Sequence, residues 1–214
     1  MSKYLWLIDE GHGGINPNGI YTTPPEKSKQ YTFDEEPVTV YEGLTNRLIG
    51  TRLMRGLSDA DIEFKKIAAA VEDTPLRDRV NMADDIYEQR KDAIYISIHS
   101  NKVSPEISGP SKGASGMMVF TSKGQTRSDV IAEIFIKTPC QVPWIMRKDM
   151  KDGDGDYEED FYVLRKTDCP AILLECLFYD NLEQAKYLLS DSGQQTIANW
   201  IFNSILQVED QYKG

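Results

Sequence analysis

Short runs of apolar residues constrain the fold of this 214-residue chain more than any other feature. Four of them, at 4–8, 94–98, 117–120 and 171–174, are rich in Ile, Val and Leu. They are continuous rather than alternating with polar residues, which is typical of strands that are covered on both faces. Residues 62–67 are a possible further strand, although their period is ambiguous.

Segments with helical periodicity separate these runs. The residues expected to face the core are Leu44, Leu48, Leu53 and Leu57; Leu76, Val80, Ala83 and Ile86; Val130, Ile131, Ile134 and Phe135; and Ile197, Ile201 and Ile205. Glu42 begins the first helix, while Thr74 and Pro75 supply an N-cap and a first-turn proline for the second. Strands that alternate with helices predict an α/β fold, with a mostly parallel twisted sheet and helices on both faces.

No composition shift or linker divides the chain, so we expect a single domain over residues 1–214 without a separate second domain. Residues 16–39 and 101–115 are rich in Pro, Ser, Gly and Lys, and they predict long loops. Long loops in a compact domain are often functional.

The net charge of −10 argues against binding to duplex nucleic acid or to anionic lipid. No apolar run approaches the roughly 20 residues that span a bilayer. The first run is followed at once by Asp9 and Glu10, which predicts a buried strand rather than a signal peptide.

We expect neither disulfide bonds nor a cysteine-based metal site in this protein. Cys140, Cys169 and Cys176 include no Cys-x-x-Cys pair, and three cysteines cannot all form disulfides with one another. We therefore expect free thiols, and a zinc site built from cysteines is disfavoured.

The chain has two histidines, and both lie where a strand ends. His12 follows the first strand in a glycine-rich turn, and His99 closes the strand at 94–98. Ligands of open α/β sheets bind beyond the carboxyl ends of the strands, and neutral imidazole is a preferred zinc ligand. The shared position favours a metal site over two structural histidines.

Two carboxylates can complete such a site. Glu175 ends the apolar strand at 171–174, where it is either a general base or half of a structural salt bridge. A catalytic zinc usually has three protein ligands, and Glu42 at the start of a helix is our choice for the third. The competing carboxylates for that role are Glu26, Glu35 and Glu36.

Four motifs occur in the order in which a known family carries them. The segments 9–14, 41–47, 97–101 and 170–175 closely resemble the zinc-dependent N-acetylmuramoyl-L-alanine amidases of the amidase-3 type. The resemblance covers about residues 4–189 and is nearest to phage or prophage endolysins.

The resemblance implies cleavage of the amide bond between N-acetylmuramic acid and L-alanine of the peptidoglycan stem peptide. It implies one zinc ion per chain, held by His12, Glu42 and His99, with Glu175 as the catalytic glutamate. The expected partner is peptidoglycan or a muramyl peptide, and the expected place of action is the bacterial cell wall, in the periplasm or outside the cell. The helix at 76–83 matches a family helix whose role is structural.

One departure from the family pattern follows Glu175. The family often carries a glycine shortly after its glutamate, and Leu177 occupies that position here. This exchange can alter the wall of the cleft while leaving the ligands intact. Asp9 and Glu10 are candidates for orienting a ligand histidine, although a strand-end turn and a surface charge explain them equally well.

The acidic run at 152–160 suggests calcium at first sight. An EF-hand loop needs glycine at its sixth position and glutamate at its twelfth, but counting from Asp152 gives Tyr157 and Val163. The run therefore predicts a solvated loop that borders the cleft.

Two alternatives remain to the amidase hypothesis. Another zinc peptidase is disfavoured because the His-Glu-x-x-His and His-x-x-Glu signatures are absent. An inactive peptidoglycan-binding module of the same fold is the second alternative. A binding module would have no need of Glu175, so the presence of that carboxylate favours an enzyme.

Overall fold

The structure is a computed structural model, and it describes residues 2–103 and 113–213. The predicted loop at 101–115 therefore lies mostly outside the described residues. Its first residue, Asn101, belongs to a strand.

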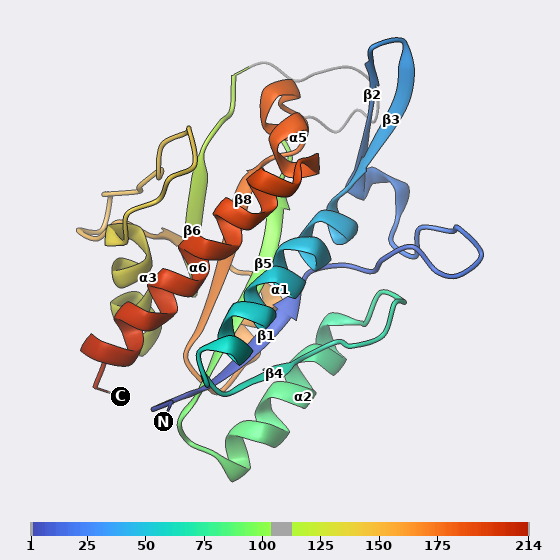
Figure 1. The fold of residues 1–214 in the computed structure, drawn as a ribbon. Helices are drawn as coiled ribbons and strands as arrows, with labels where there is room; N and C mark the ends of the chain where they lie inside the picture. The colour runs from blue at the N-terminus through green and yellow to red at the C-terminus, as the bar shows by residue number, and fades with distance from the viewer. Residues whose placement is uncertain (1, 104–112, 214) are drawn as a thin grey trace.

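A six-stranded sheet with the order β4-β1-β5-β8-β6-β7 forms the centre of the molecule (Figure 1). Its strands are β1 (Leu5–Glu10), β4 (Phe64–Lys66), β5 (Ala93–Asn101), β6 (Met117–Thr121), β7 (Tyr157–Glu158) and β8 (Ala171–Phe178). Strands β4, β1, β5 and β8 are parallel, β6 is antiparallel to β8, and β7 is parallel to β6. The predicted strands and the mostly parallel sheet are confirmed.

Helices cover both faces of this sheet. They are α1 (Glu42–Asp59), α2 (Leu76–Gln89), α3 (Arg127–Lys137), α4 (Tyr162–Lys166), α5 (Leu182–Leu189) and α6 (Asp191–Gln211), with a short 3-10 turn, η1 (Pro25–Lys27). Helices α1, α3, α5 and α6 pack on one face, and α2 and α4 pack on the other. Figure 1 shows α1 and α6 side by side across the near face.

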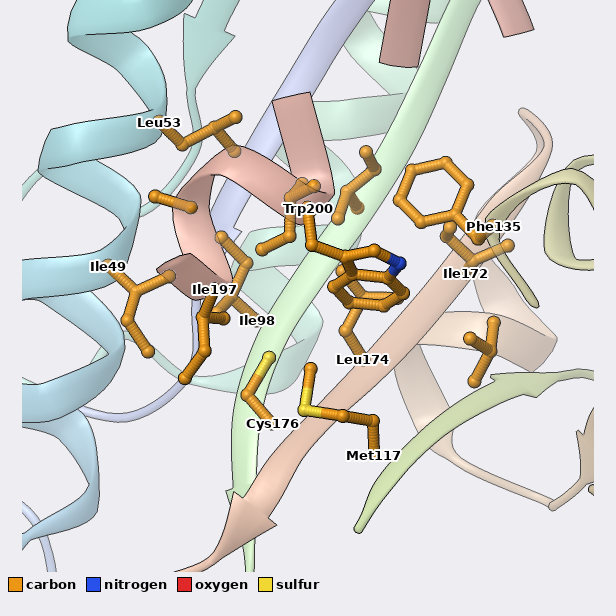
Figure 2. Packing of buried hydrophobic residues seen from close by; sticks show 14 of the residues in the cluster. Ile49, Leu53, Ile98, Met117, Phe135, Ile172, Leu174, Cys176, Ile197 and Trp200 are labelled. Atoms are coloured by element: carbon orange, nitrogen blue, oxygen red, sulfur yellow. The ribbon is translucent and has the colours of Figure 1, made fainter. Parts of the chain in front are cut away.

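The alternation of side chains along each strand divides the core into two layers. In β1, Trp6 and Ile8 join the layer under α1 and α6, while Leu5 and Leu7 join the layer under α2. Because both layers are apolar, these strands read as continuous apolar runs in the sequence. Figure 2 shows the first layer, in which Trp200 packs edge-on against Phe135 with ring centroids 5.8 Å apart.

The expected core faces of three helices need correction. In α1, Leu48 is exposed, and the buried face instead carries Ile49, Leu53 and Leu57. Asn46 shares that face because its side chain bonds to backbone and side-chain groups below the helix.

In α2, Val80 and Ala83 are buried as predicted, but Leu76 is exposed. The N-cap residue is Pro75, which makes no side-chain capping bond, so the prediction of Thr74 as the cap is wrong. In α3, Val130 was also expected to face the core, but it is exposed. In α6, the three predicted core residues are buried.

The segment at 16–39 is more ordered than the predicted loop. It contains an antiparallel hairpin of β2 (Ser28–Phe33) and β3 (Glu36–Tyr41), joined by Asp34 and Glu35. Both connecting residues have positive φ, as a two-residue hairpin turn requires. The hairpin leads directly into α1, so it fixes where Glu42 begins that helix.

The structure describes all three cysteines and most of the rest of the chain. Cys140, Cys169 and Cys176 are free thiols. Within residues 2–103 and 113–213, no helix has the length and apolar character needed to cross a bilayer.

Candidate functional site

Neighbouring strands bring His99 and Glu175 together. The two residues are directly paired in the register between β5 and β8, on the carboxyl-terminal side of the parallel sheet. Their side chains point to the same face because residues that pair across neighbouring strands share a face. Both line a cleft of about 870 Å³ at this end of the sheet.

His12 reaches the same cleft from the turn after β1. Its backbone has φ of 66°, a left-handed conformation that histidine tolerates better than most residues. Arg47 Nη1 donates a hydrogen bond of 2.6 Å to the His12 carbonyl oxygen and thereby fixes the turn. Gly11 is required here, because a Cβ at that position would lie 2.2 Å from the His99 ring.

Glu42 lies between the two histidines at the start of α1. Its Oε1 is 3.2 Å from His12 Nε2 and 3.0 Å from His99 Nδ1, and the side chain is only 3% exposed. These three residues form a group whose donor atoms lie within 4.8 Å of one another. The structure thus brings together the three residues predicted as ligands.

The competing carboxylates do not reach this group. Glu35 and Glu36 are exposed at the tip of the β2–β3 hairpin. Glu26 is exposed in the turn before β2 and lines the cleft without joining the group.

The group has the chemistry of a zinc site. Burial lowers the pKa of His99, which favours the neutral imidazole that binds metals. Ligands about 2.0–2.1 Å from a tetrahedral zinc lie about 3.3 Å apart, close to the separations around Glu42. His12 Nε2 is buried and makes no hydrogen bond to any described residue. The two imidazoles and the carboxylate therefore fit a zinc ion.

Electrostatic interactions within the group are strong. Burial favours a protonated Glu42, but the neighbouring imidazoles of His12 and His99 outweigh it and hold the pKa of Glu42 well below its usual range. Burial also opposes protonation of His12, yet Asp73 and Glu42 raise its pKa. Asp73 Oδ2 is 3.8 Å from His12 Nδ1.

Glu175 has a different environment from Glu42. Its Oε2 is buried and has no hydrogen-bond partner among the described residues. Burial, followed by the negative charge of Glu42, raises the pKa of Glu175 well above its ordinary value, and Lys27 opposes that rise. Lys27 is thus a nearby cation that favours the ionised form of Glu175, and its Nζ is 3.8 Å from Glu42 Oε2.

Leu177 distorts the backbone just beyond Glu175. Its φ is 70°, and the register between β5 and β8 shifts at this point. A left-handed conformation favours glycine, the residue that the family often carries there. The Leu177 side chain is fully buried in the core, so its packing holds the unfavourable backbone in place.

Asp9 and Glu10 do not contact the histidines, so the expectation that either orients a ligand is wrong. Asp9 is buried, pairs with Arg79 and accepts hydrogen bonds from Tyr95 and Ser97. Glu10 points to the other face, where Lys66 Nζ lies 2.6 Å from its carboxylate.

Arg79 of α2 connects the turn that carries His12 to the sheet. Besides pairing with Asp9, its guanidinium donates to the carbonyl oxygens of Glu10 and His12 at 3.1 and 3.3 Å. The side chain is buried. The predicted structural role of this helix is thus a network that supports the His12 turn.

Replacing Arg79 by methionine is expected to lower the free energy of unfolding by about 3–5 kcal/mol, because it leaves the Asp9 carboxylate buried without its partner. Urea unfolding of both proteins measures this difference. Arg77→Met, at an exposed position of the same helix, should change it by no more than about 0.5 kcal/mol. A loss as small for Arg79→Met as for Arg77→Met would contradict this role.

Three residues of the site were not identified from the sequence. Asp73 and Lys27 come from segments without periodicity, and only the folded chain places them beside His12 and Glu42. The Tyr21 hydroxyl accepts a hydrogen bond from Gly43 N at 3.0 Å and so holds the start of α1.

Comparisons with known proteins agree with this arrangement. The chain is 26% identical over 97% of its length to an endolysin of Bacillus phage SPP1, and 23% identical over 94% to a probable cell wall amidase, LytH, of Staphylococcus epidermidis. It spans 66% and 57% of the length of these two relatives.

The fold is similar to that of the N-acetylmuramoyl-L-alanine amidase from Clostridium difficile 630. The TM-score is 0.72, with 23% sequence identity and complete coverage of both chains. Residues 7–207 match the family model described as Amidase_3, N-acetylmuramoyl-L-alanine amidase. Because this match covers almost the whole chain, the protein belongs to the Amidase_3 family.

Proposed function

We propose that this protein is a zinc-dependent hydrolase that cleaves the amide bond between N-acetylmuramic acid and L-alanine of the peptidoglycan stem peptide. The observation that carries this proposal is the convergence of His12, Glu42 and His99 beside Glu175, whose buried Oε2 has no hydrogen-bond partner among the described residues. Membership of the Amidase_3 family supports it, as does similarity to an endolysin and a probable cell wall amidase.

One zinc ion per chain would be held by His12 Nε2, His99 Nδ1 and the Glu42 carboxylate, a ligand set typical of catalytic zinc. When bound, zinc supplies polarisation of the scissile carbonyl and activation of a water molecule.

Glu175 is the proposed general base. It accepts a proton from the attacking water and then donates it to the nitrogen of the leaving L-alanine. The ammonium group of Lys27 favours the ionised form of Glu175 that can accept this proton. The burial that raises the pKa of Glu175 favours its protonated form, which can donate the proton afterwards.

The proposed substrate is a peptidoglycan strand or a muramyl peptide, and the proposed place of action is the bacterial cell wall. The cleft of about 870 Å³ is large enough for a small peptide or sugar segment. Residues 1–214 would act as one catalytic domain that recognises this substrate through the cleft.

The chemistry of the products tests the proposal. Zinc-loaded protein incubated with purified peptidoglycan should release new L-alanine amino termini and no new reducing sugar ends. New reducing ends would indicate glycosidase chemistry and contradict the proposal. Binding to peptidoglycan without new amino termini would instead identify an inactive wall-binding module.

A further inference from the structure

The acidic run at 152–160 is not the fully solvated loop that the sequence predicts. Asp156 is only 1% exposed, although it lies among charged residues in the sequence. Its Oδ2 accepts a hydrogen bond of 2.5 Å from Thr121 Oγ1, at the end of β6. Its Oδ1 is buried and has no hydrogen-bond partner among the described residues. A buried carboxylate oxygen without a partner is costly, so something else must satisfy it.

Two more carboxylates face Asp156. The Asp154 carboxyl group lies within hydrogen-bonding reach of it, and Asp154 Oδ1 is likewise buried and unpaired. Asp129, in the first turn of α3, adds a third negative charge. None of these three aspartates belongs to an ion pair with a described Lys, Arg or His.

A fourth carboxylate lies at the margin of this cluster. Glu133 of α3 has its Oε2 buried without a hydrogen-bond partner among the described residues, and a Cβ added to Gly155 would lie 3.3 Å from this oxygen. Glu133 Oε1 pairs with Lys137 at 2.9 Å. The loop thus packs against α3 with carboxylates on both sides. Close packing of like charges is stable only if protons or a cation neutralise them.

We propose that Asp154 and Asp156 bind a calcium ion at the end of β6, with Asp129 adding negative charge. The available donors are all oxygens, which calcium prefers, and no histidine or cysteine is present to favour zinc. The loop alternates Asp and Gly from Asp152 to Asp156, and Gly153 has φ of 113°, so the backbone can curve around an ion. This site would fasten the loop to β6 and α3.

This calcium site is separate from the candidate zinc site. Strand β6 runs antiparallel to β8, and Met118 pairs with Glu175 whereas Phe120 pairs with Leu173. Thr121 therefore lies towards the amino-terminal end of β8, and the cleft opens at the opposite end. The residues that line the cleft include none of the carboxylates of the acidic cluster.

Protons compete with the cation for this site. Burial, together with the neighbouring Asp154 and Asp129, raises the pKa of Asp156 to about 7, although the Thr121 hydrogen bond opposes the rise. The Asp156 carboxyl group is thus protonated in mild acid and ionised above neutrality. Calcium should bind more weakly as the pH falls below about 7.

Calorimetric titration and thermal unfolding of the zinc-loaded full chain test the proposal. At slightly alkaline pH we expect one calcium ion per chain and a rise in Tm, because an ion that binds only the folded state stabilises it. Asp156→Asn and Asp154→Asn should each weaken calcium binding by about tenfold or more. Asp152→Asn, at an exposed position of the same loop, is the matched control and should bind as the parent protein does.

The calcium-free proteins provide a check on folding. Asp156→Asn removes a repulsive charge at constant shape, so its Tm without calcium should equal or exceed that of the parent protein. The proposal is overturned if millimolar calcium neither binds nor raises the Tm of the parent protein, in which case the aspartates share a proton instead. Unchanged calcium binding by Asp156→Asn, or binding of magnesium in preference to calcium, would also overturn it.

Discussion

Glu175→Gln is expected to abolish amide cleavage while leaving the fold and the bound zinc intact. The amide is nearly isosteric with the carboxylate but cannot accept a proton from water near neutral pH. A general acid–base group contributes about 10²–10⁴-fold to the rate, so the loss should be of that size. Release of L-alanine amino termini from peptidoglycan measures the rate, and elemental analysis measures the zinc.

Glu183→Gln is a suitable control for this experiment. Glu183 is an exposed residue of α5 that pairs with Lys186 on the same helix, and it does not line the cleft, so its replacement should leave the rate unchanged. Full turnover by Glu175→Gln would remove Glu175 from the mechanism. Loss of zinc from Glu175→Gln would instead make Glu175 a ligand.

Removal of a zinc-ligating side chain is expected to cause a large loss of zinc affinity. His99→Ala or Glu42→Ala removes one of three donors, and zinc affinity should fall by more than about 100-fold, since changes even outside the ligand sphere cost 10–100-fold. Protein purified without chelators should contain close to one zinc ion per chain, whereas the two variants should contain little. Activity should fall in parallel.

Glu35→Ala and Glu36→Ala distinguish Glu42 from the other carboxylates of the same region. Both positions are exposed at the hairpin tip, and both variants should keep zinc and activity. Zinc loss in either of them, with zinc retained in Glu42→Ala, would show that the third ligand comes from the hairpin.

The sequence predicts the central strands well because their physical signal is strong. Strands β1, β5 and β8 are buried between two apolar layers, and each therefore appears as a continuous apolar run. The hairpin of β2 and β3 has no such signal, since Gln30, Thr32 and Glu36 are exposed among its residues. A polar hairpin cannot be distinguished from a loop by periodicity alone.

Helix orientation is predicted less well where apolar residues are adjacent. In α1, Leu48 and Ile49 are neighbours, so the apolar pattern does not decide which of them is buried. The decision comes from Asn46, which bonds to the Gly11 carbonyl oxygen and to Ser100 and so rotates the helix. Such contacts between distant segments are not visible in a single periodic window.

The candidate site likewise contains residues that the sequence predicts and residues that it does not. His12, His99 and Glu175 were predictable because each follows an apolar strand, and the carboxyl ends of parallel strands meet at one edge. Asp73 and Lys27 were not, because their loops acquire a position only after folding. The burial of Asp156 could not be predicted either, because the sequence of an acidic run does not indicate which of its side chains is buried.

Anomalous X-ray scattering at the zinc absorption edge, from crystals of protein never exposed to chelator, tests the central claim most directly. The account predicts one strong peak per chain, bounded by His12 Nε2, His99 Nδ1 and the Glu42 carboxylate at about 2.0–2.2 Å, with Glu175 outside that distance. A peak elsewhere, ligation by Glu175 in place of Glu42, or no zinc at these histidines would contradict it.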